Sequence, residues 1–346
     1  MLMAPLKVCV VGAGAIGGYL AGKLALSGHE VSVIARGSHL DAIRLRGLTL
    51  VDQSGNRAVA RVAHASDCLS AARSQNYLFL AVKSHQLANI AQELFECYDN
   101  STTVVTLQNG IPWWYFHGHG GEHEGRQLSS VDPDGRLSRF IPARRVIGAV
   151  VHKAACLLEP GVVLHTDVAS DTFPLGELDG SNTARIRTIS DALENAGIRA
   201  PVVDRIRDEK WYKLWGNMVF NPVCALTHAN CKEFFELEET QRLGLALMEE
   251  ARAVAEKLGV RFTATPLDRM ERTRAVGAIQ PSMLQDTEAG RQLEVEAMLG
   301  AIVELGRLTH TDIPRVQAMY ACTKLLASVI GNRRVQIVPK RLDQGS

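Results

Sequence analysis

A glycine-rich loop near the N-terminus constrains the fold more than any other feature of this sequence. The residues Gly12-Ala13-Gly14-Ala15-Ile16-Gly17 follow an apolar run, Val8 to Val11, and precede a helical pattern over residues 15–27. Gly28 is placed to end that helix, and Val31 to Ala35 is typical of a second buried strand. A strand, a tight turn, a helix and a strand in this order predict a dinucleotide-binding βαβ unit.

The three glycines of the loop have separate expected roles. Gly12 permits the tight turn, Gly14 lets the backbone approach a pyrophosphate, and Gly17 lets the helix pack closely on the strand. The N-terminus of the helix also favours the charge of the phosphates. The remaining loop residues are expected to contact the cofactor as well: Ala13, Ala15 and Ile16. The alternative is a glycine-rich turn that binds nothing.

Two cations are expected near the cofactor. An acidic residue at the end of the second strand would bind the ribose 2′-hydroxyl of NAD, but Arg36 stands there. A guanidinium pairs well with the 2′-phosphate of NADP, so we predict NADPH/NADP+ rather than NADH/NAD+. Lys83 follows a further predicted strand, Tyr77 to Val82, at the same edge of the sheet. For both cations a solvated surface position is the alternative.

The alternation of strand and helix continues beyond the loop. Apolar runs at 77–82 and 103–107 flank a helical stretch around 85–97, which predicts a doubly wound parallel sheet. Residues 111–145 break this pattern, so we interpret them as a lid or surface insertion. Short strands are expected to resume after this excursion: 146–151, 162–165 and 172–175.

The second part of the chain has a different character. From about residue 207, long helical patterns follow one another with few strand signals. We therefore predict an α/β fold class, with a Rossmann-type NADP-binding domain over 1–204 and an all-α substrate and catalytic domain over 205–332. Residues 333–346 form a polar tail. Packing of the helical domain between subunits would give a homodimer.

Composition excludes several classes of protein. The 38 basic and 37 acidic side chains leave a formal net charge of +1, so no nucleic acid partner is expected. The seven cysteines contain no Cys-x-x-Cys pair, which argues against a disulfide framework or zinc site and favours a cytoplasmic location. No apolar run approaches the ~20 residues of a membrane helix. His117, His119 and His123 are separated by flexible glycines, so no metal is predicted.

A polar face marks the helical part. Lys213, Asn217 and Asn221 recur at i, i+4 and i+8, which places them on one side of a helix. Pro222 disfavours helical geometry at Asn221, so we expect the helix to kink or end there and release that amide toward a pocket. Polar groups among tryptophans, valine and phenylalanine are costly to bury unless something bonds them.

On these motifs the sequence resembles the ketopantoate reductases (2-dehydropantoate 2-reductases) from the glycine loop to about residue 330. The residues that carry the resemblance are Gly12 to Gly17, Arg36, Lys83, Gln108-Asn109-Gly110, Lys213, Asn217, Asn221, Ser282-Met-Leu-Gln-Asp286 and Glu294. The resemblance implies a 6-phosphogluconate-dehydrogenase-like fold. It also implies NADPH-dependent reduction of a 2-keto acid to a 2-hydroxy acid, in this family ketopantoate to pantoate in pantothenate biosynthesis.

The resemblance also implies roles for the site residues. Lys213 is the general acid that protonates the ketone oxygen, and an ordinary lysine, with a pKa of about 10.4, is protonated at pH 7. Asn217 and Asn221 hold Lys213 and the polar groups of the substrate. Asn109 lies beside the nicotinamide and the substrate. Two further residues bind the substrate: Ser282 and Glu294.

Each of the last three residues has a simpler interpretation. Asn109-Gly110 is also typical of a turn. Ser282 and Gln285 have the spacing of a helix-capping box, which needs no ligand. Glu294 is expected on a helix rich in charged residues, where it would be a solvated charge.

Two departures leave the substrate open. The family's usual asparagine before the serine falls on Ile279, and its usual Asn-Gly falls on Leu299-Gly300. The cluster Trp113-Trp114-Tyr115-Phe116 either roofs the cleft or packs. A more apolar 2-keto acid is therefore an alternative to ketopantoate. The rival classes are a β-hydroxyacid-dehydrogenase-like enzyme, suggested by the helical Lys-x-x-x-Asn, and a catalytically silent NADPH sensor.

Overall fold

A computed structural model describes residues 4–168 and 170–340. The chain divides into two compact units, Met1–Glu209 and Lys210–Ser346. The boundary falls inside one long helix, α6 (Ile206–Thr227). Each unit therefore receives part of this helix, and each is described by itself.

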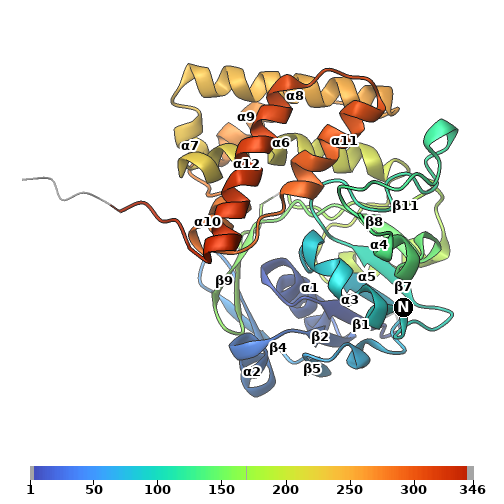
Figure 1. Ribbon diagram of the computed structural model, residues 1–346. Helices are drawn as coiled ribbons and strands as arrows, with labels where there is room; N and C mark the ends of the chain where they lie inside the picture. Colours follow the sequence, from blue (N-terminus) through green and yellow to red (C-terminus); the bar gives the residue numbers. More distant parts are fainter. Residues whose placement is uncertain (1–3, 169, 341–346) are drawn as a thin grey trace, which may run out of the picture. The chain divides into compact units, whose positions relative to one another are not determined.

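A seven-stranded sheet forms the centre of the first unit (Figure 1). Its strands lie in the order β11 (Leu175–Glu177), β8 (Val146–Ala149), β7 (Thr103–Thr106), β6 (Tyr77–Leu80), β1 (Lys7–Val11), β2 (Glu30–Ile34) and β5 (His64–Ser66). Neighbouring strands pair in parallel, except that β11 is antiparallel to β8. This sheet confirms the predicted doubly wound α/β fold. The helices of this unit are α1 (Ala15–Leu26), α2 (Gly37–Arg46), α3 (Ser84–Phe95), α4 (Arg136–Phe140) and α5 (Ala184–Asn195).

Both faces of the sheet are covered, which explains why its strands are continuous apolar runs. Val8 and Val10 of β1 are fully buried on the face that α1 and α5 cover. Cys9 and Val11 point the other way, into a core that includes residues of α3. Alternate residues of one strand therefore anchor two separate cores.

A second, four-stranded sheet was not predicted. Its strands lie in the order β4 (Arg57–Ala60), β3 (Leu48–Val51), β10 (Val162–His165) and β9 (Ala155–Glu159). The strand expected at 162–165 exists, but it belongs to this sheet. The strand expected at 172–175 begins later, at Leu175. Helix α1 packs against the second sheet as well, and a side chain at Gly22 would lie 2.9 Å from Leu50.

The excursion at 111–145 leaves the sheets as expected, and its residues 117–127 are mostly exposed, whereas its aromatic cluster packs inside the first unit. Trp113 is 3% exposed, and Trp114, Tyr115 and Phe116 are fully buried. The Trp114 indole donates to the Thr106 hydroxyl at 3.0 Å, so it packs on the end of β7. Of the two possibilities open for this cluster, packing is the observed one: Trp113 and Trp114 join the core that includes residues of α3, because large apolar side chains are costly to leave solvated.

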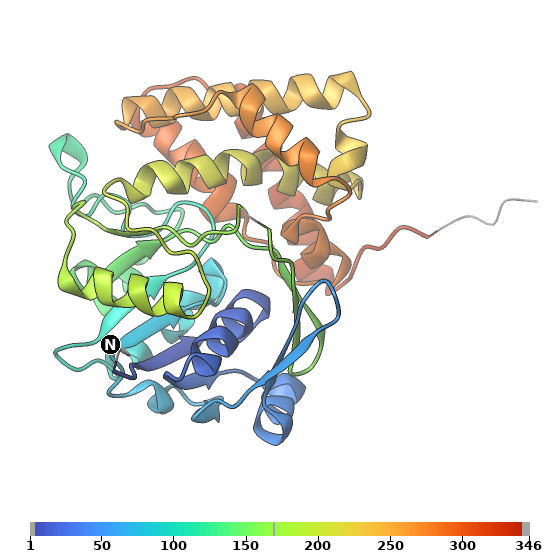
Figure 2. The same ribbon diagram turned by 180° about the vertical axis from the view of Figure 1, so that it is seen from behind.

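Up to residue 340, the helical unit contains six further α-helices after α6: α7 (Cys231–Phe234), α8 (Glu238–Lys257), α9 (Pro266–Val276), α10 (Ser282–Glu288), α11 (Ala301–Leu308) and α12 (Pro314–Arg333). A π-helical turn, Glu296–Gly300, precedes α11. Helix α8 packs against α9, α11 and α12 (Figure 2). No helix in the described part of the chain is long and apolar enough to cross a membrane.

The end of α6 and the start of the C-terminal tail differ from the sequence-based expectations. Helix α6 does not end at Asn221 but continues through Pro222 to Thr227. Of the predicted polar tail at 333–346, residues 341–346 lie outside the described residues. The described part of the tail turns back onto α10, where the Ile337 amide donates to the Thr287 carbonyl at 3.3 Å.

Candidate active site

The predicted cofactor residues follow four neighbouring parallel strands. Asn109 comes after β7, Lys83 after β6, the glycine loop after β1 and Arg36 after β2. These four strands lie side by side in the order β7, β6, β1 and β2. Because all four are parallel, the residues share the carboxyl edge of the sheet, which is where open α/β sheets bind their ligands.

The glycine loop has the backbone geometry that a close ligand needs. Gly12 has φ +98°, and a side chain there would lie 2.8 Å from the Val82 amide nitrogen. A Cβ at Gly17 would lie 2.1 Å from the Gly12 carbonyl oxygen, so only glycine lets α1 start this close to β1. A Cβ at Gly14 would meet nothing within 4 Å. The backbone at Gly14 is therefore open on one side.

The other residues of this edge occupy helix starts and turns. Arg36 is exposed, and Lys83 is half-buried; they are the residues before α2 and α3, respectively. Asn109 is half-buried beside Gly110, whose φ of +78° lies in the left-handed region that favours glycine. Gln108, the residue before Asn109, donates to the Leu80 and Val82 carbonyls at 2.7 and 3.0 Å. Its amide thereby ties the ends of β6 and β7 together.

Helix α6 presents the polar face predicted in the second unit. Lys213 and Asn217 are half-buried, and Asn221 is 4% exposed. The Asn221 amide donates to the Met298 sulfur at 3.5 Å. Because α6 continues through Pro222, the helix end expected at Asn221 is wrong. Asn221 packs against the π-helical turn instead.

Charged groups gather around Lys213 within the helical unit. Burial lowers the pKa of Lys213 to about 8; the Glu294 carboxylate raises this pKa, and the Arg269 guanidinium lowers it further. Lys210 lies one turn earlier on α6, and burial together with the Lys213 charge lowers its pKa to about 7. The ordinary lysine pKa assumed from the sequence is therefore too high. A lysine with a pKa near 8 remains mostly protonated at pH 7 and transfers its proton more readily.

Arg269, on α9, is a part of this site that no sequence motif indicated. One of its terminal nitrogens lies only 1.9 Å from where a side chain at Gly216 would begin. Its guanidinium lies 5.6 Å from the centre of the Tyr212 ring and donates to the Thr273 hydroxyl at 2.6 Å. Gly216 leaves the space for this contact, because any side chain there would displace the guanidinium. Only the packing of α9 on α6 reveals that Arg269 belongs to the charged group around Lys213.

The expectations for Ser282 and Glu294 change in the structure. Ser282 is exposed and is the first residue of α10; the residue before the helix is Pro281, which makes no side-chain cap. The predicted capping box is therefore wrong, and Gln285 donates to the Gln280 carbonyl instead. Glu294 is half-buried in the segment before the π-helical turn, not on a helix. Its influence on both lysines shows that it is not simply a solvated charge.

The two departures from the family pattern differ in position. Ile279 is 38% exposed, whereas Leu299 is fully buried in the helical unit. Leu299 is thus a core residue. Of the two departures, only Ile279 has a side chain that a ligand could reach.

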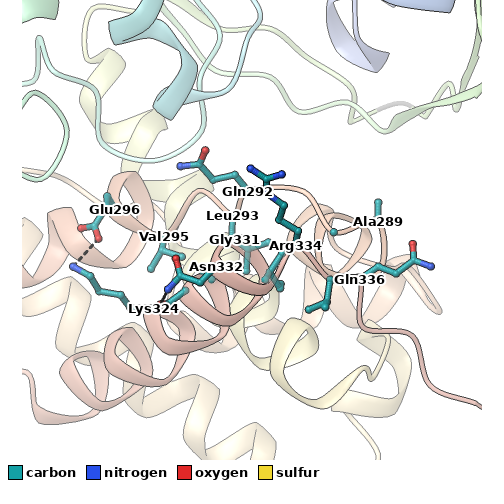
Figure 3. A pocket seen from close by; sticks show the side chains of 15 residues that line it. Ala289, Gln292, Leu293, Val295, Glu296, Lys324, Gly331, Asn332, Arg334 and Gln336 are labelled. Carbon is teal, nitrogen blue, oxygen red and sulfur yellow. Dashed lines mark hydrogen bonds and ion pairs between the residues drawn. The ribbon is translucent and has the colours of Figure 1, made fainter.

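A pocket of about 740 Å³ lies elsewhere in the helical unit (Figure 3). Gln292, Leu293 and Val295 line it together with the C-terminal part of α12, and Lys324 pairs with Glu296 at 3.0 Å near one end. Glu294 lies in the same segment but does not line the pocket. No predicted site residue lines this pocket, so it is separate from the group around Lys213.

Comparison with known proteins relates the whole chain to one family. The model for ketopantoate reductase PanE/ApbA matches residues 8–180, and the model for its C-terminal part matches residues 205–327. The 2-dehydropantoate 2-reductase of Mesorhizobium japonicum is 43% identical over 324 residues, covering 93% of this chain and 98% of the relative. That of Archaeoglobus fulgidus is 28% identical, covering 87% and 90%. A Ralstonia solanacearum structure, provisionally named a ketopantoate reductase, is 33% identical with a TM-score of 0.87, covering 95% of this chain and 99% of that chain.

Proposed function

The chain belongs to the ketopantoate reductase family, and from this premise we propose that it is an NADP-dependent oxidoreductase that reduces 2-dehydropantoate (ketopantoate) to pantoate. The broader reaction is reduction of a 2-keto acid to a 2-hydroxy acid. The observation that carries the proposal is a half-buried lysine, Lys213, whose pKa is lowered to about 8 among other charged groups.

Lys213 is assigned the role of general acid. NADPH, when bound, supplies the hydride to the ketone carbon. The Lys213 ammonium stabilises the negative charge that develops on the ketone oxygen and transfers a proton to that oxygen. Asn217 lies one turn further along α6 and orients the ammonium and the substrate. Asn221 is buried against Met298, and this contact is assigned the role of holding the polar face of α6 in place.

An excess of positive charge supports an anionic substrate. Lys213 has two basic neighbours, Lys210 and Arg269, and one acidic neighbour, Glu294. A substrate carboxylate would reduce this excess and relieve the cost of burying it. Ser282, exposed at the start of α10, and Glu294 are assigned to substrate binding.

The sheet edge supports NADPH as the cofactor. The open side of Gly14 and the N-terminus of α1 suit a pyrophosphate, and the exposed Arg36 suits a 2′-phosphate. Lys83 follows β6 and Asn109 follows β7, and both are assigned to the nicotinamide half of the cofactor. The predicted functional division, with cofactor binding in 1–204 and catalysis in 205–332, is part of the proposal.

The test is NADPH oxidation with a panel of 2-keto acids, measured for the wild-type chain and Lys213→Ala. We expect ketopantoate to be reduced and Lys213→Ala to lower kcat by about 10²–10⁴-fold with NADPH affinity unchanged. Lys232→Ala, at an exposed lysine on α7, is the matched control and should retain wild-type activity. Near-normal turnover of Lys213→Ala would end the assignment of the general acid.

The same panel decides the substrate. Ile279 replaces a polar residue of the family pattern at an exposed position, so apolar 2-keto acids belong in the panel beside ketopantoate. Oxidation of NADPH with an apolar 2-keto acid but not with ketopantoate would reject ketopantoate and keep the reaction class. Binding of NADPH without oxidation by any keto acid would favour a sensor.

The cellular setting is also a proposal. All seven cysteines are unpaired, which supports a reducing cytoplasm, and the proposed reaction would place the enzyme in pantothenate biosynthesis. We also propose a homodimer formed through the helical domain. Sedimentation of the purified chain tests the dimer, and a monomer at micromolar concentration would reject it.

A further inference from the structure

His39 contacts the backbone of the glycine loop. Its Nε2 lies 2.6 Å from the Ala13 carbonyl oxygen, and its Nδ1 lies 3.0 Å from the Gly161 amide nitrogen. A backbone amide can only donate, so Nδ1 must accept and the proton of the neutral ring must be on Nε2. The imidazole therefore donates to Ala13 and accepts from Gly161 at the same time.

This contact sets the orientation of one peptide group. Every peptide bond in the described chain is trans, so the Ala13 carbonyl and the Gly14 N–H point in opposite directions. With the carbonyl directed at His39, the Gly14 N–H is directed away from it. On the β2 side, the Gly12 and Ala13 amides both donate to the Ile34 carbonyl, at 3.0 and 3.1 Å. The loop backbone is thus hydrogen-bonded both to β2 and to His39.

We propose that His39 is a positioning residue for the cofactor: it fixes the Ala13–Gly14 peptide so that the Gly14 N–H is presented to the pyrophosphate of NADPH. The inference rests on the proposed function, because it needs NADPH as the ligand of the loop. Gly14 is the loop glycine with open space beside it, so the N–H that His39 orients belongs to the residue a pyrophosphate can approach.

The position of His39 links two parts of the cofactor site. His39 lies in the first turn of α2, three residues after Arg36, which precedes the same helix. Gly161 lies between β9 and β10, and its carbonyl accepts from the Thr49 amide of β3 at 2.8 Å. The second sheet therefore anchors the imidazole, and the imidazole in turn anchors the loop. This gives the second sheet a role in cofactor binding.

Two substitutions separate the two hydrogen bonds. The side-chain amide of His39→Gln can reach the position of Nε2 and still donate to the Ala13 carbonyl. The shorter His39→Asn can place its oxygen near Nδ1, accept from Gly161 and leave Ala13 without its donor. If the contact with Ala13 matters for the cofactor, glutamine should preserve NADPH binding and asparagine should not.

The experiment measures dissociation constants of the full chain for NADPH and for adenosine 2′-phosphate, without substrate. We expect His39→Asn to bind NADPH about fivefold to tenfold more weakly, the effect of losing one oriented hydrogen bond, and His39→Gln to stay within about twofold of wild type. Adenosine 2′-phosphate has no pyrophosphate, so its affinity should not change in either variant. The kcat at saturating NADPH should also stay at the wild-type value.

Several results would overturn the inference. Equal weakening in both variants, or parallel loss of adenosine 2′-phosphate binding, would show that His39 merely maintains the fold of α2. Unchanged NADPH affinity in His39→Asn, with wild-type turnover intact, would reject the role of His39 and leave the proposed function standing. Failure of the wild-type chain to bind NADPH would reject both.

Discussion

Lys213 shows how neighbouring charges tune a single residue. Its pKa of about 8 reflects burial first and then the opposed influences of Glu294 and Arg269. A general acid must be protonated, so kcat/KM for keto acid reduction should fall as the pH rises above about 8. This fall is the basic limb of the pH profile, and it is measured as the pH dependence of NADPH oxidation at saturating cofactor. A limb near pH 10, the value of an exposed lysine, would contradict the assigned environment.

Arg269 offers a second prediction at this scale. Arg269→Met removes a positive charge near Lys213, so the Lys213 pKa should rise and the basic limb should move to higher pH. Arg272→Met is the matched control, because the Arg272 guanidinium also lies 5.6 Å from the Tyr212 ring but does not shift the Lys213 pKa. A limb that moves equally in both variants would point to loss of the contact with Tyr212 instead.

The sequence indicates some of these residues and hides others. Lys213, Asn217 and Asn221 are visible through their spacing, because helical periodicity is a local property. Lys210 stands three residues before Lys213 in the sequence. No local sequence pattern, however, indicates that its side chain is buried. Arg269 is separated by more than fifty residues from Gly216, against which it packs, so its role depends on packing that no motif records.

The strand–loop–helix element at the N-terminus permits a paired test of two glycines. A Cβ at Gly17 would lie 2.1 Å from a backbone oxygen, whereas one at Gly14 would meet nothing within 4 Å. Gly17→Ala should therefore destabilise the first unit by about 1–3 kcal/mol through overpacking. Gly14→Ala should leave stability unchanged but weaken NADPH binding, because its methyl group occupies the side open to the pyrophosphate.

Thermal unfolding and NADPH titration of the two glycine variants separate these effects. The free energy of unfolding should fall only for Gly17→Ala, and the NADPH affinity of the folded protein should fall for Gly14→Ala. Tight NADPH binding by Gly14→Ala would show that the pyrophosphate does not approach the loop at this residue.

Elements with strong local signals were predicted well, and elements that depend on partners were not. The β1–α1–β2 unit lies where the apolar runs and Gly28 placed it. The second sheet escaped notice because β4 is mostly exposed and lacks a continuous apolar run. At Pro222 the local preference for a helix end was overridden by tertiary packing, since Val219, Val223 and Cys224 around it are all buried.

At the scale of the whole chain, the alternation of strands and helices predicted a parallel sheet followed by a helical unit, and both exist. The sequence also placed Arg36, Lys83 and Asn109 after strands. Only the structure shows that those strands are neighbours in the order β7, β6, β1 and β2. Strand order depends on long-range pairing, so a list of strand ends does not by itself establish a continuous binding edge.

That binding edge predicts how the cofactor changes global stability. A ligand that binds only the folded chain stabilises it by about 2.7 kcal/mol at 100 times its dissociation constant. NADPH should therefore raise the melting temperature, and NADH at the same concentration should raise it less, because Arg36 has no 2′-phosphate to pair with. Arg36→Ser should reduce the difference between the two cofactors. The chain forms two compact units. If these units unfold in separate transitions, NADPH should raise mainly the melting temperature of the first unit. Equal shifts with NADH and NADPH in the wild-type chain would reject Arg36 as the selector.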